Sequence, residues 1–172
     1  MGTIVSQEKN QKVVKIISWL LIVVSALVLF RSLFALQGYT AMITMQSITK
    51  KFNPSVGINF TLFFVQNAVE LLLCIVLFVS ATFVLKYRNQ WRKVLVYGLI
   101  ASIIFLMVSP IINYNNMPAL KMASNGGIEK EMMNVAKTSI LIWSYFWSIV
   151  LSTFFIVVIQ KFSKEEVKLL FI

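Results

Sequence analysis

Four long apolar segments, separated by shorter polar stretches, dominate the sequence. They cover approximately residues 16–36, 58–85, 94–112 and 138–160. A helix needs roughly 20 mainly apolar residues to cross a bilayer, and the four segments meet this requirement. Because lipid offers no partners for backbone polar groups, the segments are expected to be helices. The pattern predicts an all-α, polytopic membrane protein with a single domain over residues 1–172. This domain is a four-helix transmembrane bundle made of two hairpins, with a short tail at residues 161–172.

The basic residues predict how this bundle is oriented. The connector "KYRNQWRK" joins the second and third segments, and lysines flank the first and the fourth (Lys9, Lys12, Lys15, Lys161, Lys164 and Lys168). By the positive-inside rule, both termini and this connector are cytoplasmic, and the longer loops 37–57 and 113–137 lie outside. The bias is incomplete, because five lysines fall on the predicted outer side (Lys50, Lys51, Lys121, Lys130 and Lys137). The short loops and the missing disulfides favour a bacterial inner membrane.

Composition supports the membrane assignment and excludes several function classes. The chain is 59% hydrophobic with a formal net charge of +10, but its Lys and Arg residues are scattered between apolar blocks and form no basic face for nucleic acid. It has no His, and its one Cys, Cys74, falls inside the second segment. Metal sites, Ser-His-Asp and Cys-His pairs, CxxC motifs and glycine-rich phosphate loops are therefore missing. We expect no cofactor, no metal ion and no enzymatic activity.

Glu70 is unusual because it lies inside the second apolar segment. Arg31 is sixteen residues after Lys15, and Glu70 is sixteen residues before Lys86. At 1.5 Å per residue, both side chains lie about 24 Å from the cytoplasmic flank. The equal depth predicts a buried salt bridge between Arg31 and Glu70. Gln66 and Asn67 precede Glu70 by four and three residues, so they share its helix face and can donate hydrogen bonds to the pair.

The same count extends this polar layer to the other two segments. Sixteen residues after Lys93 comes Ser109, and sixteen residues before Lys161 comes Tyr145. One interpretation of the layer is an ion or proton path, or a site for a polar group. The other is a structural pair that sets the packing of the first hairpin and excludes alternatives. The absence of a second carboxylate and of His favours the structural interpretation.

The fourth segment carries a second pattern of small and aromatic residues. Ser144, Ser148 and Ser152 recur every fourth residue, and the third segment offers Gly98 and Ser102 at matching spacing. Such small residues let helices approach closely, which predicts packing between the third and fourth segments or a surface for a partner. Trp143 and Trp147 lie well inside the segment and are expected either in the bundle core or against that partner. In the tail, apolar residues among lysines predict an interfacial helix on the membrane surface (Phe162, Val167, Leu169, Leu170 and Phe171).

These features together predict a non-enzymatic membrane protein that acts by binding another membrane protein. It would be an accessory subunit, a regulator or an immunity-type factor, in contact with membrane lipids and with a second protein or a second copy of itself. Four spans in 172 residues with basic inner turns resemble immunity proteins against pore-forming bacteriocins, in size and topology only. The alternative is a small homo-oligomeric transporter or channel-forming subunit in which Glu70 titrates or contacts a cation.

Overall fold

The structure, a computed structural model, describes residues 2–52, 60–116 and 127–171, and this part is helical except for short turns. Four long helices are followed by one short helix: α1 (Gly2–Phe52), α2 (Phe60–Val84), α3 (Asn89–Asn116), α4 (Gly127–Ser163) and α5 (Glu165–Lys168). Each long helix contains an apolar stretch that can cross a membrane: Gln7–Gly38, Phe64–Val84, Asn89–Ile112 and Thr138–Ser163. The protein is therefore a multi-pass, helical membrane protein, which confirms the predicted all-α class and the four spans.

The helices extend beyond the predicted spans, and the predicted outer loops are wrong over much of their length. Helix α1 continues to Phe52, through most of the loop expected at 37–57, and α4 already begins at Gly127. Residues 53–57 lie outside the described part. Hydropathy marks where a helix leaves the bilayer and not where it ends. The stretch after Gly38 holds no Pro, so the backbone hydrogen bonding of α1 continues.

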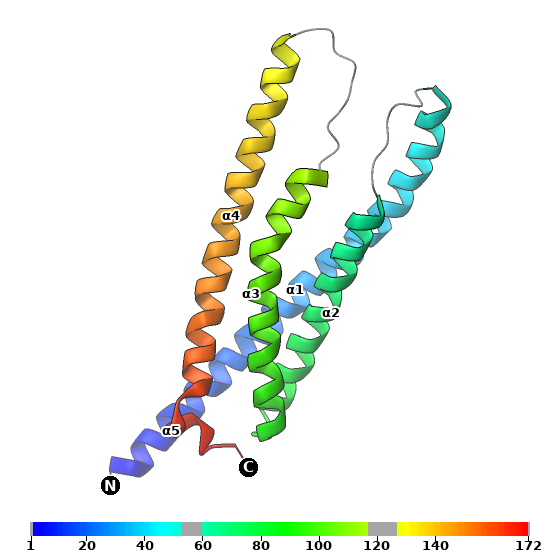
Figure 1. Ribbon diagram of the computed structural model, residues 1–172. Helices are drawn as coiled ribbons and strands as arrows, with labels where there is room; N and C mark the ends of the chain where they lie inside the picture. Colours follow the sequence, from blue (N-terminus) through cyan, green and yellow to red (C-terminus); the bar gives the residue numbers. More distant parts are fainter. Residues whose placement is uncertain (1, 53–59, 117–126, 172) are drawn as a thin grey trace.

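Helices adjacent in sequence pack side by side. Extended contacts join α1 to α2, α2 to α3 and α3 to α4, whereas α1 and α4 share no extended contact among the described residues. Both chain ends lie at the same end of the molecule, and from there α1 and α4 diverge (Figure 1). The bundle is therefore closed at the end that holds the termini and open between α1 and α4 at the other.

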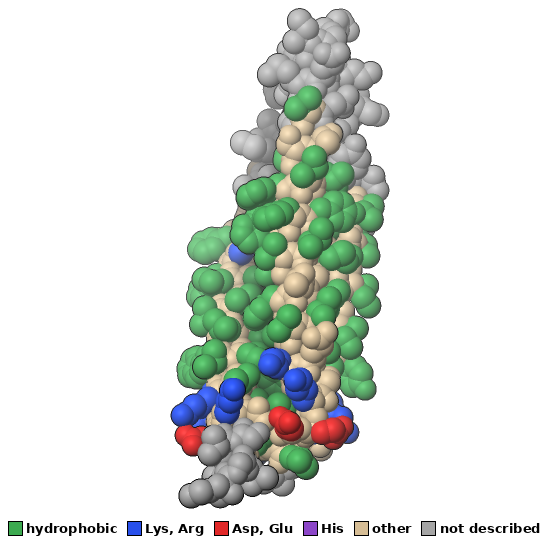
Figure 2. Space-filling model, turned by 90° about the vertical axis from the view of Figure 1, so that its left-hand side faces the viewer, with side chains coloured by type: hydrophobic (Ala, Val, Ile, Leu, Met, Phe, Trp, Pro, Cys, Tyr) green, Lys and Arg blue, Asp and Glu red, His purple; other side chains and the backbone are tan. Residues whose placement is uncertain are grey.

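A buried apolar core closes the end of the bundle that holds the termini. It joins residues from all five helices: Val14, Leu21, Leu77, Ala81, Val84, Leu95, Leu99, Phe155, Val158, Phe162, Val167, Leu170 and Phe171. Figure 2 shows most of the Lys and Arg side chains on this face gathered at the same end, below a broad apolar surface. The apolar surface faces lipid, and the basic end lies at the membrane boundary.

The C-terminal tail is part of this core, which corrects the prediction of a helix lying on the membrane surface. Val167, Leu170 and Phe171 are buried, whereas Leu169 is exposed. The Asn10 side chain donates a hydrogen bond of 3.2 Å to the Glu166 carboxylate, which ties α5 to α1. The hydrophobic surface of the tail thus finds protein partners at the closed end of the bundle and does not need the lipid.

Tyr87 sits in the turn between α2 and α3, in the left-handed backbone conformation with φ of 54°. Its ring packs against Phe171 with a centroid distance of 5.8 Å. Its hydroxyl is buried and has no hydrogen-bond partner among the described residues. Burial therefore raises the pKa of Tyr87 above the ordinary value, because the phenolate would lose its hydration.

This burial predicts an alkaline loss of stability. The folded chain holds the Tyr87 proton more tightly than the unfolded chain, so its stabilising contribution is complete below the ordinary pKa of about 10 and is lost as pH rises through the higher folded value. We expect Tyr87→Phe to reduce the fall in thermal stability above about pH 10, where tyrosines ionise. The control is Tyr97→Phe, on an exposed residue of α3. The prediction would be contradicted if the melting temperature fell equally with rising pH in the wild type and in Tyr87→Phe.

Candidate binding cavity

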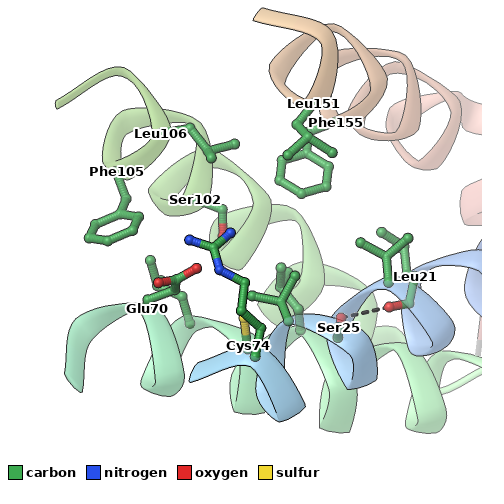
Figure 3. A pocket seen from close by; sticks show the side chains of 14 residues that line it. Leu21, Ser25, Glu70, Cys74, Ser102, Phe105, Leu106, Leu151 and Phe155 are labelled. Carbon is green, nitrogen blue, oxygen red and sulfur yellow. Dashed lines mark hydrogen bonds between the residues drawn. The ribbon is translucent and has the colours of Figure 1, made fainter. Parts of the chain in front are cut away.

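A cavity lies among the four long helices, on the open side of the core. Its larger part, which we call the polar chamber, measures about 530 Å³. The polar chamber is lined by Arg31, Ala35, Gln66, Asn67, Glu70, Phe105, Leu106, Ser109, Ile140, Trp143, Ser144, Trp147, Ser148 and Leu151. A smaller part of about 120 Å³, the apolar chamber, shares Arg31, Glu70, Phe105, Leu106 and Leu151 with it and extends toward the core. Figure 3 shows labelled side chains from all four long helices around this smaller part.

The structure brings most of the predicted polar layer together. Arg31, Gln66, Asn67, Glu70 and Ser109 all line the polar chamber. The Gln66 side-chain amide donates a hydrogen bond of 2.6 Å to the Ser109 hydroxyl, which links α2 to α3 within the bilayer. Its carbonyl oxygen is buried and has no partner among the described residues.

The sixth member of that layer, Tyr145, does not line either chamber. Counting residues from the membrane boundary fixes the depth of a side chain but not the rotation of its helix. At the depth of Glu70, helix α4 presents Trp143, Ser144 and Trp147 to the cavity in place of Tyr145.

The predicted salt bridge between Arg31 and Glu70 is absent from the described part of the chain. The two ion pairs found there are Lys12–Glu8 and Lys168–Glu165. Arg31 and Glu70 do line the same cavity, close enough to attract each other. Figure 3 shows the Glu70 carboxylate on α2 directed toward the space between α2 and α3. Arg31 and Glu70 therefore place two opposite charges on the cavity wall without direct contact between them.

Apart from Arg31 and Glu70, which also line the polar chamber, the apolar chamber has hydroxyl groups that are already hydrogen-bonded. The Ser25 hydroxyl donates to the Leu21 carbonyl oxygen at 2.6 Å, and the Ser102 hydroxyl donates to the Gly98 carbonyl oxygen at 2.8 Å (Figure 3 draws the first). Both serines thus bond the backbone of their own helix and need no further partner. The remaining wall is mostly aliphatic and aromatic, with the Cys74 thiol among it.

The predicted small-residue stripe of α4 divides between core and cavity. Ser148 and Ser152 are buried, and Ser144 and Ser148 line the polar chamber. Gly98 was predicted to pack against this stripe on α4, but it faces α2 instead. A Cβ atom added at Gly98 would lie 3.3 Å from the side chains of Val76 and Leu77 on α2. Gly98 therefore allows close packing of α3 on α2, whereas Ser102 faces the apolar chamber.

The two tryptophans mark the mouth of the cavity. Trp143 and Trp147 line the polar chamber and are nevertheless 62% and 48% exposed. Their rings meet edge to face with a centroid distance of 5.9 Å. Arg31 on α1 also lines the polar chamber and is exposed at the surface. The mouth therefore lies between α1 and α4, the two helices that diverge in Figure 1.

The apolar walls of the cavity were not predicted. Phe105, Leu106, Ile140 and Leu151 are ordinary apolar residues in apolar segments, so no sequence signal separates them from lipid-facing neighbours. Within the described part of the chain, no three His, Cys, Asp or Glu side chains come close enough to hold a metal ion. The groups that line the cavity can attract charges and donate hydrogen bonds.

No protein-family model matches the chain, and the searches of curated proteins and of solved structures found no similar protein.

Proposed function

We propose that the protein is non-enzymatic and acts by binding another membrane protein, as an accessory subunit, a regulator or an immunity-type factor. The partner is a transmembrane helix that lies across the mouth of the cavity, between α1 and α4. One observation carries this proposal: α1 and α4 diverge, and Trp143 and Trp147 stay exposed beside the serines of α4.

The chemistry of the mouth suits a helix as its occupant. Apolar surface alone gives no driving force for association in lipid, because lipid tails are as apolar as Leu. Association therefore depends on small residues, on polar side chains and on close packing. The mouth offers Ser144 as the small residue, Arg31 as the polar group and two aromatic anchors.

Site-specific crosslinking tests this proposal. A photoreactive phenylalanine analogue replaces Trp147 at the mouth, and in the control it replaces Tyr97, which is exposed on α3 and lines neither chamber. We expect one defined membrane protein to be captured from Trp147 and not from Tyr97. That protein, once purified, should bind the wild-type chain in nanodiscs, and Ser144→Leu should weaken the binding about tenfold. The matched control is Thr153→Leu, on an exposed residue of the same helix.

Any of four outcomes would overturn the partner proposal. Capture of the same proteins from both positions would show nonspecific contact in the bilayer. Capture of a second copy alone would assign the mouth to self-association, and capture of lipid alone would leave no protein partner. Equal binding by Ser144→Leu and Thr153→Leu would show that the mouth is not the docking surface.

A second candidate is a homo-oligomeric transporter or channel-forming subunit that uses Glu70. The presence of Glu70 in the polar chamber favours it. The core at the basic end disfavours it, since buried residues of all five helices close that end to a through-going path. Cation flux into proteoliposomes that is abolished by Glu70→Gln, from a purified homo-oligomer, would replace the binding proposal with transport.

We further propose that the termini and the turn between α2 and α3 lie in the cytoplasm, at a bacterial inner membrane. The gathering of Lys and Arg at the end that holds the termini supports this orientation (Figure 2). A green fluorescent protein fused after Ile172 should then fluoresce, and an alkaline phosphatase fusion should be inactive. The reverse pattern would refute the orientation.

A further inference from the structure

Glu70 and the Gln66 carbonyl oxygen lie in the polar chamber and are not used by a partner helix across the mouth. We propose that the cavity binds one zwitterionic phospholipid with an ammonium headgroup. The lipid phosphate pairs with Arg31, the ammonium group pairs with Glu70, and an acyl chain extends into the apolar chamber. This goes beyond the partner proposal and does not depend on it, because the lipid fills the cavity whether or not a helix covers the mouth.

Charge complementarity selects the headgroup. Arg31 and Glu70 line one cavity in a membrane-spanning region without an ion-pair contact. A charge in hydrocarbon without a partner is costly. A simple anion would neutralise Arg31 but leave the charge of Glu70 without a partner. A simple cation would neutralise Glu70 but leave the charge of Arg31 without one. A zwitterionic headgroup neutralises both at once, and the guanidinium can donate two parallel hydrogen bonds to a phosphate.

The remaining polar groups fit an ammonium group next to Glu70. The Gln66 carbonyl oxygen lacks a partner among the described residues and can accept one of the ammonium hydrogens. Trp143 and Trp147 offer the aromatic faces that attract a cation within about 6 Å of a ring centroid.

The size of the cavity favours a headgroup over a protein segment. A membrane-spanning helix about 10 Å wide and about 30 Å long fills roughly 2,400 Å³, so the polar chamber of about 530 Å³ cannot hold one. Small-molecule sites measure about 300–1,000 Å³, which includes the polar chamber. The apolar chamber is close to the engineered apolar cavities of about 150 Å³ that bind benzene, so it can hold the first part of an acyl chain.

The two chambers lie in the order that a membrane lipid requires. Arg31 is about 24 Å along α1 from Lys15, in a hydrocarbon layer about 30 Å thick, which places it near the leaflet surface far from the termini. The apolar chamber extends from there toward Leu21, Leu77 and Phe155, closer to the middle of the bilayer. A phospholipid of that leaflet has its headgroup and chain in the same order. The mouth between α1 and α4 opens sideways to lipid, so the molecule can enter from the bilayer.

Lipid retention by the purified chain tests the proposal. The protein is reconstituted in nanodiscs with equal amounts of phosphatidylethanolamine, phosphatidylcholine and phosphatidylglycerol, extracted in mild detergent, and examined by native mass spectrometry. We expect one retained lipid per chain, with phosphatidylethanolamine preferred over phosphatidylglycerol by about fivefold or more, as one additional charge-assisted contact would give. Arg31→Gln should reduce retention about tenfold, because it removes the phosphate partner. Glu70→Gln should reverse the preference in favour of phosphatidylglycerol, because only the cation of the site remains.

A matched pair on α4 separates the cavity from the outer surface. Leu151 lines both chambers, and Val150 is exposed and lines neither. Leu151→Trp should lose the lipid, and Val150→Trp should keep it. If Arg31→Gln does not fold, Arg31→Lys keeps the charge without the guanidinium fork, and its retention should fall between those of the wild type and Leu151→Trp.

Several results would overturn the lipid proposal. Retention in the proportions of the nanodisc, or unchanged retention in Arg31→Gln, Glu70→Gln and Leu151→Trp, would show that the cavity holds no lipid. Displacement of the retained lipid by equimolar soluble phosphoethanolamine would assign the site to a free metabolite. The experiment uses the purified chain alone, so its failure is distinguishable from a failure to capture a partner protein at Trp147.

Discussion

Replacing Arg92 by methionine is expected to lower the free energy of unfolding by about 3 kcal/mol, the upper range for hydrogen bonds to charged groups. Arg92 is only 9% exposed, at the start of α3. Its Nη1 donates to the Phe162 carbonyl oxygen in the last turn of α4 at 2.9 Å, and its Nε and Nη2 donate to the Asn89 Oδ1 at 3.1 Å. The guanidinium also lies 5.9 Å from the centroid of the Phe171 ring.

The physical reason is that Arg92 joins three parts of the closed end. The last carbonyl groups of a helix have no partner within the helix, and Arg92 supplies one to α4. Methionine fills similar space but donates nothing, so the Phe162 carbonyl and the Asn89 side chain each lose a charged donor. The measurement is unfolding in mixed micelles with increasing denaturing detergent.

The neighbouring lysine provides the control for Arg92→Met. Lys93 is exposed, so Lys93→Met removes the same charge from the same turn without breaking these hydrogen bonds. We expect a change within about 0.5 kcal/mol, as for ordinary surface substitutions. Equal losses in the two variants would mean that charge at the membrane boundary, and not the contacts of Arg92, stabilises this end.

The sequence predicted the number and class of the membrane-spanning helices because hydropathy directly reports which segments lipid can accept. It did not predict their ends. Helix α1 continues to Phe52 through a stretch of mixed polar and apolar residues, and hydropathy contains no information about helices outside the bilayer. The tail was misassigned for a related reason. Buried Phe171 and exposed Leu169 look alike in sequence, and only the contacts with α3 and α4 distinguish them.

The sequence predicted how deep the side chains of the candidate site lie in the membrane, but not which way they face. Counting along each helix put Arg31, Glu70 and Ser109 at one level, and the cavity contains all three. The rotation of each helix depends on packing, which the count ignores. The count therefore could not show that Tyr145 lines neither chamber, or that Arg31 and Glu70 make no direct salt bridge. The role of Arg92 was missed because its partner is a backbone carbonyl in α4, and backbone groups have no sequence signature.

Reversing either charge in the cavity is expected to be the most damaging change at the site. Glu70→Arg would place two guanidinium groups on one cavity wall, and Arg31→Glu would place two carboxylates there. A charge in a membrane-spanning region without an opposite charge nearby is costly, and a like charge in its place adds repulsion to that cost. We expect little folded protein from either single variant, measured as the fraction that stays monodisperse after extraction.

The double exchange, Arg31→Glu with Glu70→Arg, should recover more than half of the lost stability, because it restores opposite charges on the same wall. Since the wild-type pair is not in direct contact, this recovery would come from the net charge of the cavity and not from a particular hydrogen-bond geometry. Lys161→Glu, an exposed reversal at the basic end, controls for net charge and should be tolerated. Single variants as stable as the wild type would show that water screens the two charges, and the cavity would then need no zwitterion. A double exchange that folds and yet retains no phosphatidylethanolamine would show that the two charges also fix the direction of the headgroup. In the exchanged site, the phosphate and the ammonium group would have to exchange places while the acyl chain stays in the apolar chamber.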